Sequence, residues 1–221
     1  MASSIRLKFS RKGPVCYIGH LDLLRYFQKA ISRSNIKIKY SNGFNPHQII
    51  SFAYPLGVSM ETEGDYLDID VEEFDSLEQI VNDLNQVLNE GIKIISASLI
   101  PENALNAMAS VASADYMISI ENGCITQDML DEYLAQNEIM VMKEGKKGEK
   151  LVNIRDGIYK LLVKEEGIFM SLASGSSQNI KPQTIIDTIN SKFGTNIEVC
   201  LIKRIEIYRE ENGKFYPLGE F

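Results

Sequence analysis

The chain has 221 residues, of which 44% are hydrophobic and 24% are charged, and its formal net charge is −7. These values are ordinary for a folded domain protein, so they exclude a disordered, collagen-like or coiled-coil chain. No apolar run approaches the ~18 residues of a membrane span, and no apolar stretch follows the basic N-terminus. We therefore expect a cytoplasmic protein without a membrane partner.

The three cysteines, Cys16, Cys124 and Cys200, lie far apart in the sequence. Their spacing predicts neither a disulfide framework nor a zinc or iron–sulfur site, because such sites use closely spaced ligands. We expect no metal and no cofactor bound by the chain itself.

The charges are distributed unevenly. Residues 1–50 contain nine Lys and Arg and one acidic residue, whereas residues 51–90 contain eleven acidic residues and no Lys or Arg. Two interpretations remain open at this point. Either the two segments lie side by side and neutralise each other, or the basic segment forms an anion-binding face. Because the whole chain is acidic, we do not expect DNA as a partner.

Periodicity predicts the elements of the first half. Alternating apolar residues favour strands and apolar residues at helical spacing favour helices. We expect strands at 5–10, 36–40, 48–54, 65–71 and 92–99, and helices at 19–33 and 76–89. If 36–54 counts as one strand region, the order is strand, helix, strand, strand, helix, strand, which is typical of the ferredoxin-like fold.

The second half has a similar order. We expect strands at 114–121, 138–143, 158–164, 167–173 and 197–208, helices at 126–136 and 182–192, and a loop at 145–150. The sequence therefore predicts an α+β protein with two tandem ferredoxin-like (βαββαβ) domains and antiparallel sheets. The expected domain limits are residues 1–100 and 111–221.

The helix at 19–33 carries a row of cations. Its buried stripe is expected to run through Leu21, Leu24, Gln28 and Ile31, widened by Phe27 and Ala30. Arg25, Lys29 and Arg33 are four residues apart, so they lie on one side of the helix. The row is a candidate phosphate-binding surface; the alternatives are a solvated charged face or pairing with the acidic segment 61–75.

The loop SNGFNPH at 41–47 is rich in turn-forming residues, and such exposed loops often carry binding groups. Phe44 is a candidate for stacking on a base, and Asn42, Asn45 and His47 are candidates for specific hydrogen bonds. His20 and His47 are the two histidines and the candidate catalytic residues. For each of them, a structural role is the alternative. Asp68 and Asp70, in the strand at 65–71, are expected on its outward face.

Three runs carry a resemblance to a known family. They are IRLKFSRKGP, YIGHLDLLRYFQKAISRSNIKIKYSNGFNPHQIISFAYPLGV and EGDYLDIDV. They resemble an uncharacterised bacterial family known as radical-SAM-linked, whose members occur alone or fused C-terminally to radical S-adenosylmethionine proteins. The resemblance extends over nearly the whole chain and implies a radical S-adenosylmethionine protein as partner. Because the chain lacks closely spaced cysteines, it would be the accessory module and not the radical generator.

We therefore expect an accessory protein that binds and presents a substrate, with RNA as the candidate, and is not catalytic by itself. In this reading Arg25, Lys29 and Arg33 hold phosphates. One alternative is a metal-independent ribonuclease-like enzyme that uses His20 or His47 as acid or base. Another is a protein–protein adaptor whose charged regions dock a partner.

Overall fold

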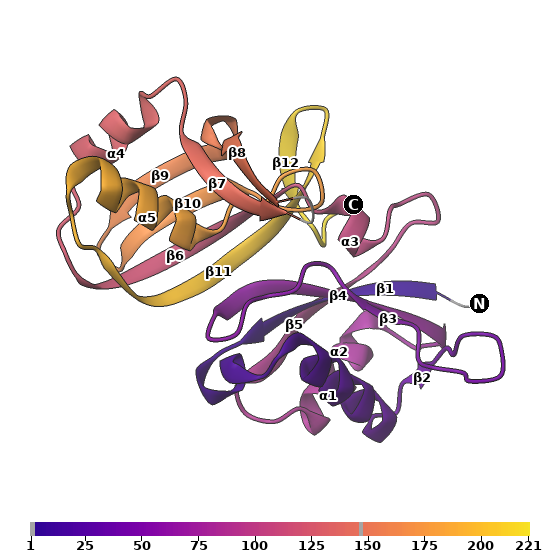
Figure 1. Cartoon of the computed structure of the whole chain (residues 1–221). Helices are drawn as coiled ribbons and strands as arrows, with labels where there is room; N and C mark the ends of the chain where they lie inside the picture. The colour runs from indigo at the N-terminus through magenta and orange to yellow at the C-terminus, as the bar shows by residue number, and fades with distance from the viewer. Residues whose placement is uncertain (1–2, 146–147) are drawn as a thin grey trace. The chain divides into compact units, whose positions relative to one another are not determined.

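A computed structural model describes residues 3–145 and 148–221 of the chain (Figure 1). The chain forms two compact units. Unit 1 consists of Met1–Ala112 and Arg204–Phe221, and unit 2 consists of Ser113–Lys203. The predicted domain limits stay a prediction, but the last residues of the chain group with its N-terminal half.

Unit 1 combines an antiparallel sheet with two main helices. Its sheet has the order β5-β1-β4-β11, and β2 and β3 also pair with β4. The elements are β1 (Ser3–Arg11), η1 (Gly13–Tyr17), α1 (His20–Arg33), β2 (Lys37–Ile38), β3 (Ile50–Phe52), β4 (Glu61–Glu73), α2 (Leu77–Val87), β5 (Ile92–Leu99), α3 (Ala107–Ser110), the last part of β11 (Glu198–Glu211) and β12 (Lys214–Pro217).

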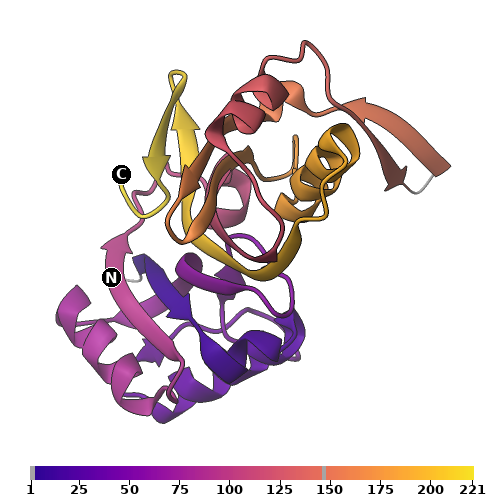
Figure 2. The same ribbon diagram turned by 90° about the vertical axis from the view of Figure 1, so that its left-hand side faces the viewer.

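The helices α1 and α2 lie on the same side of this sheet in both ribbon views (Figure 1 and Figure 2). The core between them and the sheet contains the apolar side of β1 and β4, where Leu7 pairs with Leu67. The rings of Phe9, Phe27 and Phe52 pack edge to face, with centroids 5.1–5.8 Å apart. This arrangement fixes the orientation of α1 on the sheet.

The apolar stripe of α1 differs from the predicted one. The buried residues are Leu23, Phe27, Ala30 and Ile31, whereas Leu21 is 65% exposed. The helix begins with several apolar residues in succession, so two overlapping stripes fit the sequence. Packing of Phe27 against Phe9 and Phe52 selects between them.

The opposite side of β1 and β4 is polar but buried. Arg6 donates to both carboxylate oxygens of Asp68 at 2.8 and 2.9 Å, and the backbone N–H of Ala107 donates to the same carboxylate. Asp68 is 9% exposed, so the prediction that it faces outward is wrong. Alternation identifies residues that share a face, but it does not show that residues of the 101–110 connector and the chain end cover that face. The carbonyl of Leu218 also accepts from Arg6.

Close approach of β4 and β11 places further charges in the same unit. A Cβ atom on Gly64 would lie 2.3 Å from the carbonyl oxygen of Ile205, so only glycine fits there. One residue further along β11, Glu206 accepts from Tyr66 at 2.7 Å and from Lys8 at 2.5 Å. Burial, followed by the nearby Glu206 carboxylate, raises the pKa of Tyr66.

Unit 2 has the strand order β11-β6-β10-β9 with two main helices. Its elements are β6 (Ser113–Asn122), α4 (Gln127–Leu134), β7 (Met140–Gly145), β8 (Gly148–Asn153), η2 (Arg155–Gly157), β9 (Ile158–Lys164), β10 (Gly167–Ala173), α5 (Pro182–Phe193) and the first part of β11. Pro182 opens α5, and Gly194 follows it at φ 63°, as expected at helix ends.

A two-stranded hairpin departs in part from the prediction: its first strand corresponds to the strand expected at 138–143, but its second strand was not expected. β7 pairs with β8 in a separate antiparallel ribbon, with Met142 opposite Leu151, and it extends away from the sheet of unit 2 (Figure 2). Residues 148–150, expected in a loop, therefore lie in a strand; residues 146–147 lie outside the described residues. Lys and Glu dominate this stretch, so periodicity gives no strand signal.

The coarse prediction is confirmed: the protein is α+β, with a large and mostly antiparallel sheet and several helices. Among residues 3–145 and 148–221, no helix is long and apolar enough to cross a membrane.

Candidate nucleic-acid interface

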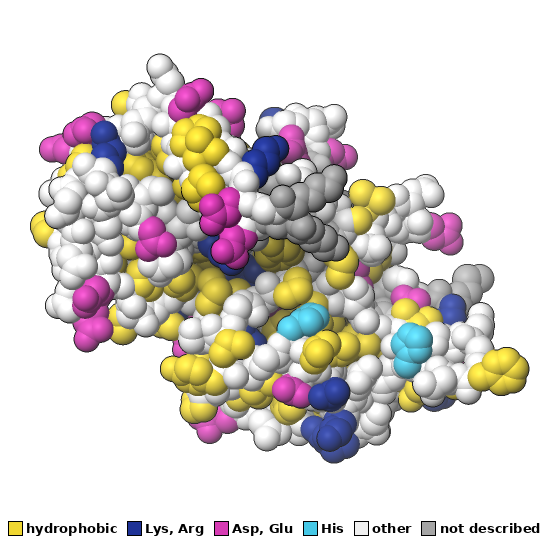
Figure 3. Space-filling view, in the orientation of Figure 1, with side chains coloured by type: hydrophobic (Ala, Val, Ile, Leu, Met, Phe, Trp, Pro, Cys, Tyr) yellow, Lys and Arg dark blue, Asp and Glu magenta, His cyan; other side chains and the backbone are white. Residues whose placement is uncertain are grey.

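The cation row lies on the exposed side of α1, opposite the buried stripe. Arg25 pairs with Asp22 at 3.0 Å within the same helix. Arg33 donates to the carbonyl of Val87 at 3.1 Å, at the C-terminal end of α2. Lys29 has no hydrogen-bond or ion-pair partner among the described residues. Figure 3 shows Lys and Arg side chains grouped over α1.

The structure separates two sets of N-terminal cations. Two of those on strands pair with the acidic segment: Arg6 bonds Asp68, and Lys37 bonds Glu73. The row on α1 makes no such pair among the described residues. The acidic segment therefore neutralises Arg6 and Lys37, whereas it forms no ion pair with the helix row among the described residues.

The row borders a shallow hollow on the surface of α1. The hollow has a volume of about 400 Å³ and is lined by Arg25, Gln28, Lys29, Ser32 and Arg33. All three cations of the row thus line one depression with two polar residues between them. An anion in this hollow would be within reach of three positive side chains.

The loop 41–47 has a closed base. The backbone N–H of Ser41 donates to the carbonyl of His47 at 2.8 Å, and Tyr40 forms a β-bridge with Gln48. The Ser41 hydroxyl also lies 2.9 Å from Nδ1 of His47 and accepts from the backbone N–H of His47. These bonds fix the His47 ring at the base of the loop, and His47 is an exposed residue.

Phe44 is fully exposed in this loop, the most exposed of the large hydrophobic residues described. The adjacent Gly43 has φ 119°, which only glycine adopts without strain. An aromatic ring held in water contributes nothing to the core of unit 1. Asn42 and Asn45 flank it and are also exposed.

Gln48 joins the loop to the helix. Its side-chain amide donates to the carbonyl of Gln28 at 3.2 Å and to the hydroxyl of Ser32 at 2.9 Å. Both acceptors belong to residues that line the hollow beside the cation row. Because Gln48 directly follows His47, these bonds attach the base of the loop to the helix that carries the row.

The two histidines are not joined by any contact among the described residues. The ring of His20 opens α1 and packs edge to face on Phe52, with centroids 5.2 Å apart. His47 lies at the base of the loop. Both are visible in Figure 3, with hydrophobic side chains between them. The structure thus attaches the base of the loop to α1 through Gln48, whereas no hydrogen bond or ion pair among the described residues joins the row to His47, Phe44, Asn42, Asn45 or His20.

Sequence reasoning missed the residues that connect the helix to the loop. Gln28 was placed on the apolar side of the helix, whereas its carbonyl and Ser32 both bind Gln48. The spacing of Gln28 and Ser32, one turn apart next to Lys29 and Arg33, is the signal that could have shown a polar strip on α1. No sequence pattern indicates that Gln48 would reach it.

Metal ligation has no support in the part of the chain that the structure describes. No group of three or more His, Cys, Asp or Glu residues there is arranged to hold an ion. The helix row offers positive charge, and the loop offers an exposed aromatic ring and amide groups.

The fold and this site define an α+β protein with a basic helix face next to an aromatic-tipped loop. Residues 4–182 match the model of the family described as "Uncharacterized protein conserved in bacteria (DUF2344)". The chain belongs to this family. No curated protein matches the chain.

One solved structure similar to this chain is the "Crystal Structure of an Unknown Protein from Galdieria sulphuraria". The two chains are 12% identical, and the alignment covers 90% of this chain and 98% of that one, with a TM-score of 0.30. A likeness at this score carries no argument about fold or function.

Proposed function

We propose that unit 1 is a binding module for single-stranded RNA. The observation that carries the proposal is the pair of hydrogen bonds from Gln48 to α1. These bonds attach the base of the loop that carries the exposed Phe44 to the helix that carries the cation row. Arg25 and Lys29 would contact phosphates, and Arg33 at the end of α1 would assist while it donates to the carbonyl of Val87. Phe44 would stack on a base, and bases stack on aromatic rings without strong sequence preference.

The exposed amide side chains could supply the base specificity that stacking does not provide. Asn42 and Asn45 can donate to and accept from base edges, and His47 can do so through Nε2 because Nδ1 is bonded to Ser41. Single-stranded RNA fits better than a duplex, because unstacked bases expose both their faces and their edges.

We further propose that the module presents its RNA to a radical S-adenosylmethionine enzyme. This part of the proposal rests on the family resemblance alone. The partner would contribute the radical chemistry. The ribonuclease alternative has less support, because the described contacts of His20 and His47 do not join them into an acid–base pair. The adaptor alternative predicts binding to a protein without RNA.

For the fold, we propose that each unit is ferredoxin-like. The order β5-β1-β4 with β2 and β3 beyond β4 supports this for unit 1, and the order β11-β6-β10-β9 supports it for unit 2. In that reading the hairpin β7–β8 is an insertion between the first helix and second strand of the repeat in unit 2.

The test is fluorescence anisotropy of labelled oligouridine with the full chain across a salt series. The variant Arg25→Ala/Lys29→Ala/Arg33→Ala should show a salt slope shallower by roughly 2, at about 0.7 per phosphate contact on a single strand. The matched control is Lys150→Ala/Lys160→Ala/Lys164→Ala, which removes the same charge from exposed positions of unit 2.

If the control loses as much affinity as the row variant, binding reflects net charge and the proposed surface is wrong. If wild type does not bind at low salt, the RNA proposal is wrong and the adaptor alternative takes its place. Cleavage of the oligonucleotide by wild type, abolished in His47→Ala, would favour the ribonuclease.

A further inference from the structure

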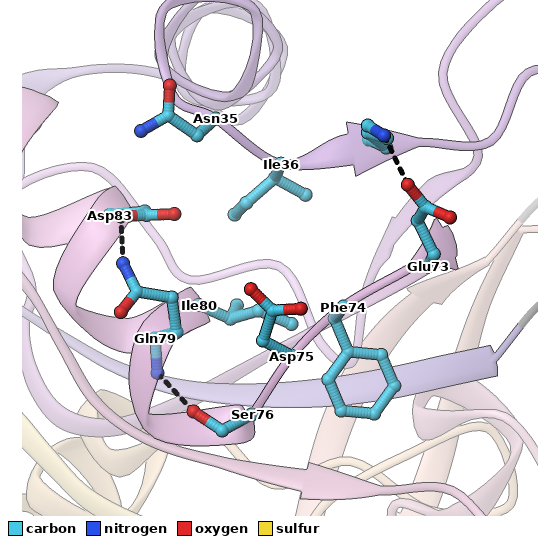
Figure 4. A pocket seen from close by; sticks show the side chains of 10 residues that line it. Asn35, Ile36, Glu73, Phe74, Asp75, Ser76, Gln79, Ile80 and Asp83 are labelled. Atoms are coloured by element: carbon cyan, nitrogen blue, oxygen red, sulfur yellow. Dashed lines mark hydrogen bonds and ion pairs between the residues drawn. The ribbon is translucent and has the colours of Figure 1, made fainter.

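A second hollow in unit 1 lies away from the cation row. It is formed by the connection from α1 to β2, the connection from β4 to α2, and the first turns of α2 (Figure 4). Its volume is about 610 Å³, within the range of ~300–1,000 Å³ for small-molecule sites. Its apolar lining consists of Ile36, Phe74 and Ile80.

Asp83 is the notable polar residue of this hollow. It is 8% exposed, and its Oδ1 accepts from Nε2 of Gln79 at 2.6 Å. Its other oxygen has no partner among the described residues, and the carboxylate is directed into the hollow (Figure 4). The one partner of this carboxylate among the described residues is a neutral amide, so no cation there balances its charge.

Two similar pairs show that Asp83 is unusual in its setting. Gln127 donates to Asp131 on α4, and Gln183 donates to Asp187 on α5, each four residues apart like Gln79 and Asp83. Asp131 and Asp187 are exposed to water, which solvates their charge. Asp83 has the same local partner but lies inside a hollow, so helix surface chemistry alone does not account for it.

The charges around the hollow leave a surplus of acceptors. Lys37 is its single cation among the described lining residues, and it pairs with Glu73 at the rim. Asp75 has no ion-pair partner among the described residues. The side-chain amide oxygens of Asn35 and Gln79 offer further acceptors. A ligand for this hollow must therefore supply hydrogen-bond donors and positive charge.

We propose that this hollow binds a small organic cation, with a guanidinium or ammonium head group on a short alkyl chain. The head group would donate to the free oxygen of Asp83, and the alkyl chain would lie on Ile36, Phe74 and Ile80. Guanidinium groups bind carboxylates through paired donors, and ammonium groups bind them as point charges. The proposal is independent of RNA binding, since none of these residues belongs to the cation row or the loop.

The probes are agmatine and putrescine, with n-butylurea as a neutral analogue, added to the full chain. Isothermal titration calorimetry and amide chemical shifts should report saturable binding of at least one cation and none of the urea. Asp83→Asn keeps the acceptor for Gln79 but removes the charge, and should lower affinity about tenfold or more. Asp187→Asn is the matched control and should leave affinity unchanged.

Shifted amides should lie in residues 35–37 and 73–83, which tests location even if Asp83→Asn is destabilised. Preference for agmatine over putrescine would indicate a guanidinium ligand, and the reverse an ammonium ligand. The proposal is overturned if neither cation binds wild type, if Asp83→Asn binds as tightly as wild type, or if the shifts lie elsewhere.

Discussion

The side-chain amide of Gln48 donates a hydrogen bond to the hydroxyl of Ser32 at 2.9 Å. Gln48 is 6% exposed, so this bond and its companion to the carbonyl of Gln28 are shielded from water. They connect the base of loop 41–47 to the middle of α1. The geometry of the proposed interface therefore depends on one buried glutamine.

Gln48→Met should weaken RNA binding without removing any group that touches RNA. Methionine fills the space but cannot donate, so the loop loses its attachment to α1 and stability falls by about 1 kcal/mol. Anisotropy and urea denaturation measure the two effects. Gln28→Ala is the control, because Gln48 bonds to the backbone carbonyl of residue 28 and the substitution keeps that acceptor. Unchanged RNA affinity in Gln48→Met would show that RNA binding does not require the attachment of the loop to α1.

Phe44→Ala should leave the midpoint of urea unfolding unchanged, because the ring is fully exposed and packs against nothing. It should weaken RNA binding by about 1–3 kcal/mol, the contribution of one stacked base. Phe44→Trp should restore affinity. A variant that unfolds more easily or binds RNA normally would contradict a stacking role for this ring.

Asp68→Ala should destabilise unit 1 by about 3–5 kcal/mol, because it leaves the buried Arg6 guanidinium without its carboxylate. The Arg6 side chain is fully buried. Asp70→Ala removes a half-buried carboxylate that accepts from Ser4 at 2.6 Å, so its effect should be smaller. Chemical denaturation measures the free energy of unfolding of both variants. Equal losses would mean that the buried Arg6–Asp68 pair contributes no more to stability than the Ser4–Asp70 hydrogen bond.

Two tyrosines should make the fold sensitive to alkali. Burial raises the pKa of Tyr66 and of Tyr133, whereas both titrate near pH 10 in the unfolded chain. The unfolded state then releases these protons first, so stability is full below about pH 10 and falls as the pH rises beyond it. Above about pH 10, the free energy of unfolding should fall less steeply with pH in Tyr66→Phe than in wild type. An unchanged slope would argue against burial as the cause.

Helices of unit 1 were predictable to within two residues. Expected helices at 19–33 and 76–89 correspond to α1 (His20–Arg33) and α2 (Leu77–Val87). Their apolar residues recur at helical spacing, and Ser76 caps the second through a hydrogen bond to Gln79. Local sequence specifies such elements because their signals lie within one or two turns.

Features that depend on distant residues were not predictable. Alternation placed Asp68 on the polar side of its strand, but its burial depends on Arg6, Ala107 and the chain end more than 30 residues away. In the hairpin β7–β8, the first strand corresponds to the strand expected at 138–143, whereas β8 begins with polar residues and is defined by its pairing with β7.

The candidate site was predictable as a set of residues but not as an arrangement. Spacing on the helix gave the row of Arg25, Lys29 and Arg33, and turn-forming residues gave the loop with Phe44. Tertiary packing produces the attachment of the loop to α1 through Gln48. It also produces the hydrogen bond that Arg33 donates to the carbonyl of Val87. No local pattern encodes either one.

The most direct test of the account is photo-crosslinking of 4-thiouridine RNA to the full chain, with the crosslinked peptides identified by mass spectrometry. RNA bound to the proposed interface should crosslink to residues of loop 41–47, Phe44 and His47 above all, and to the exposed side of α1. Crosslinks confined to unit 2 or to other faces of unit 1, with none in the loop or on α1, would contradict the account.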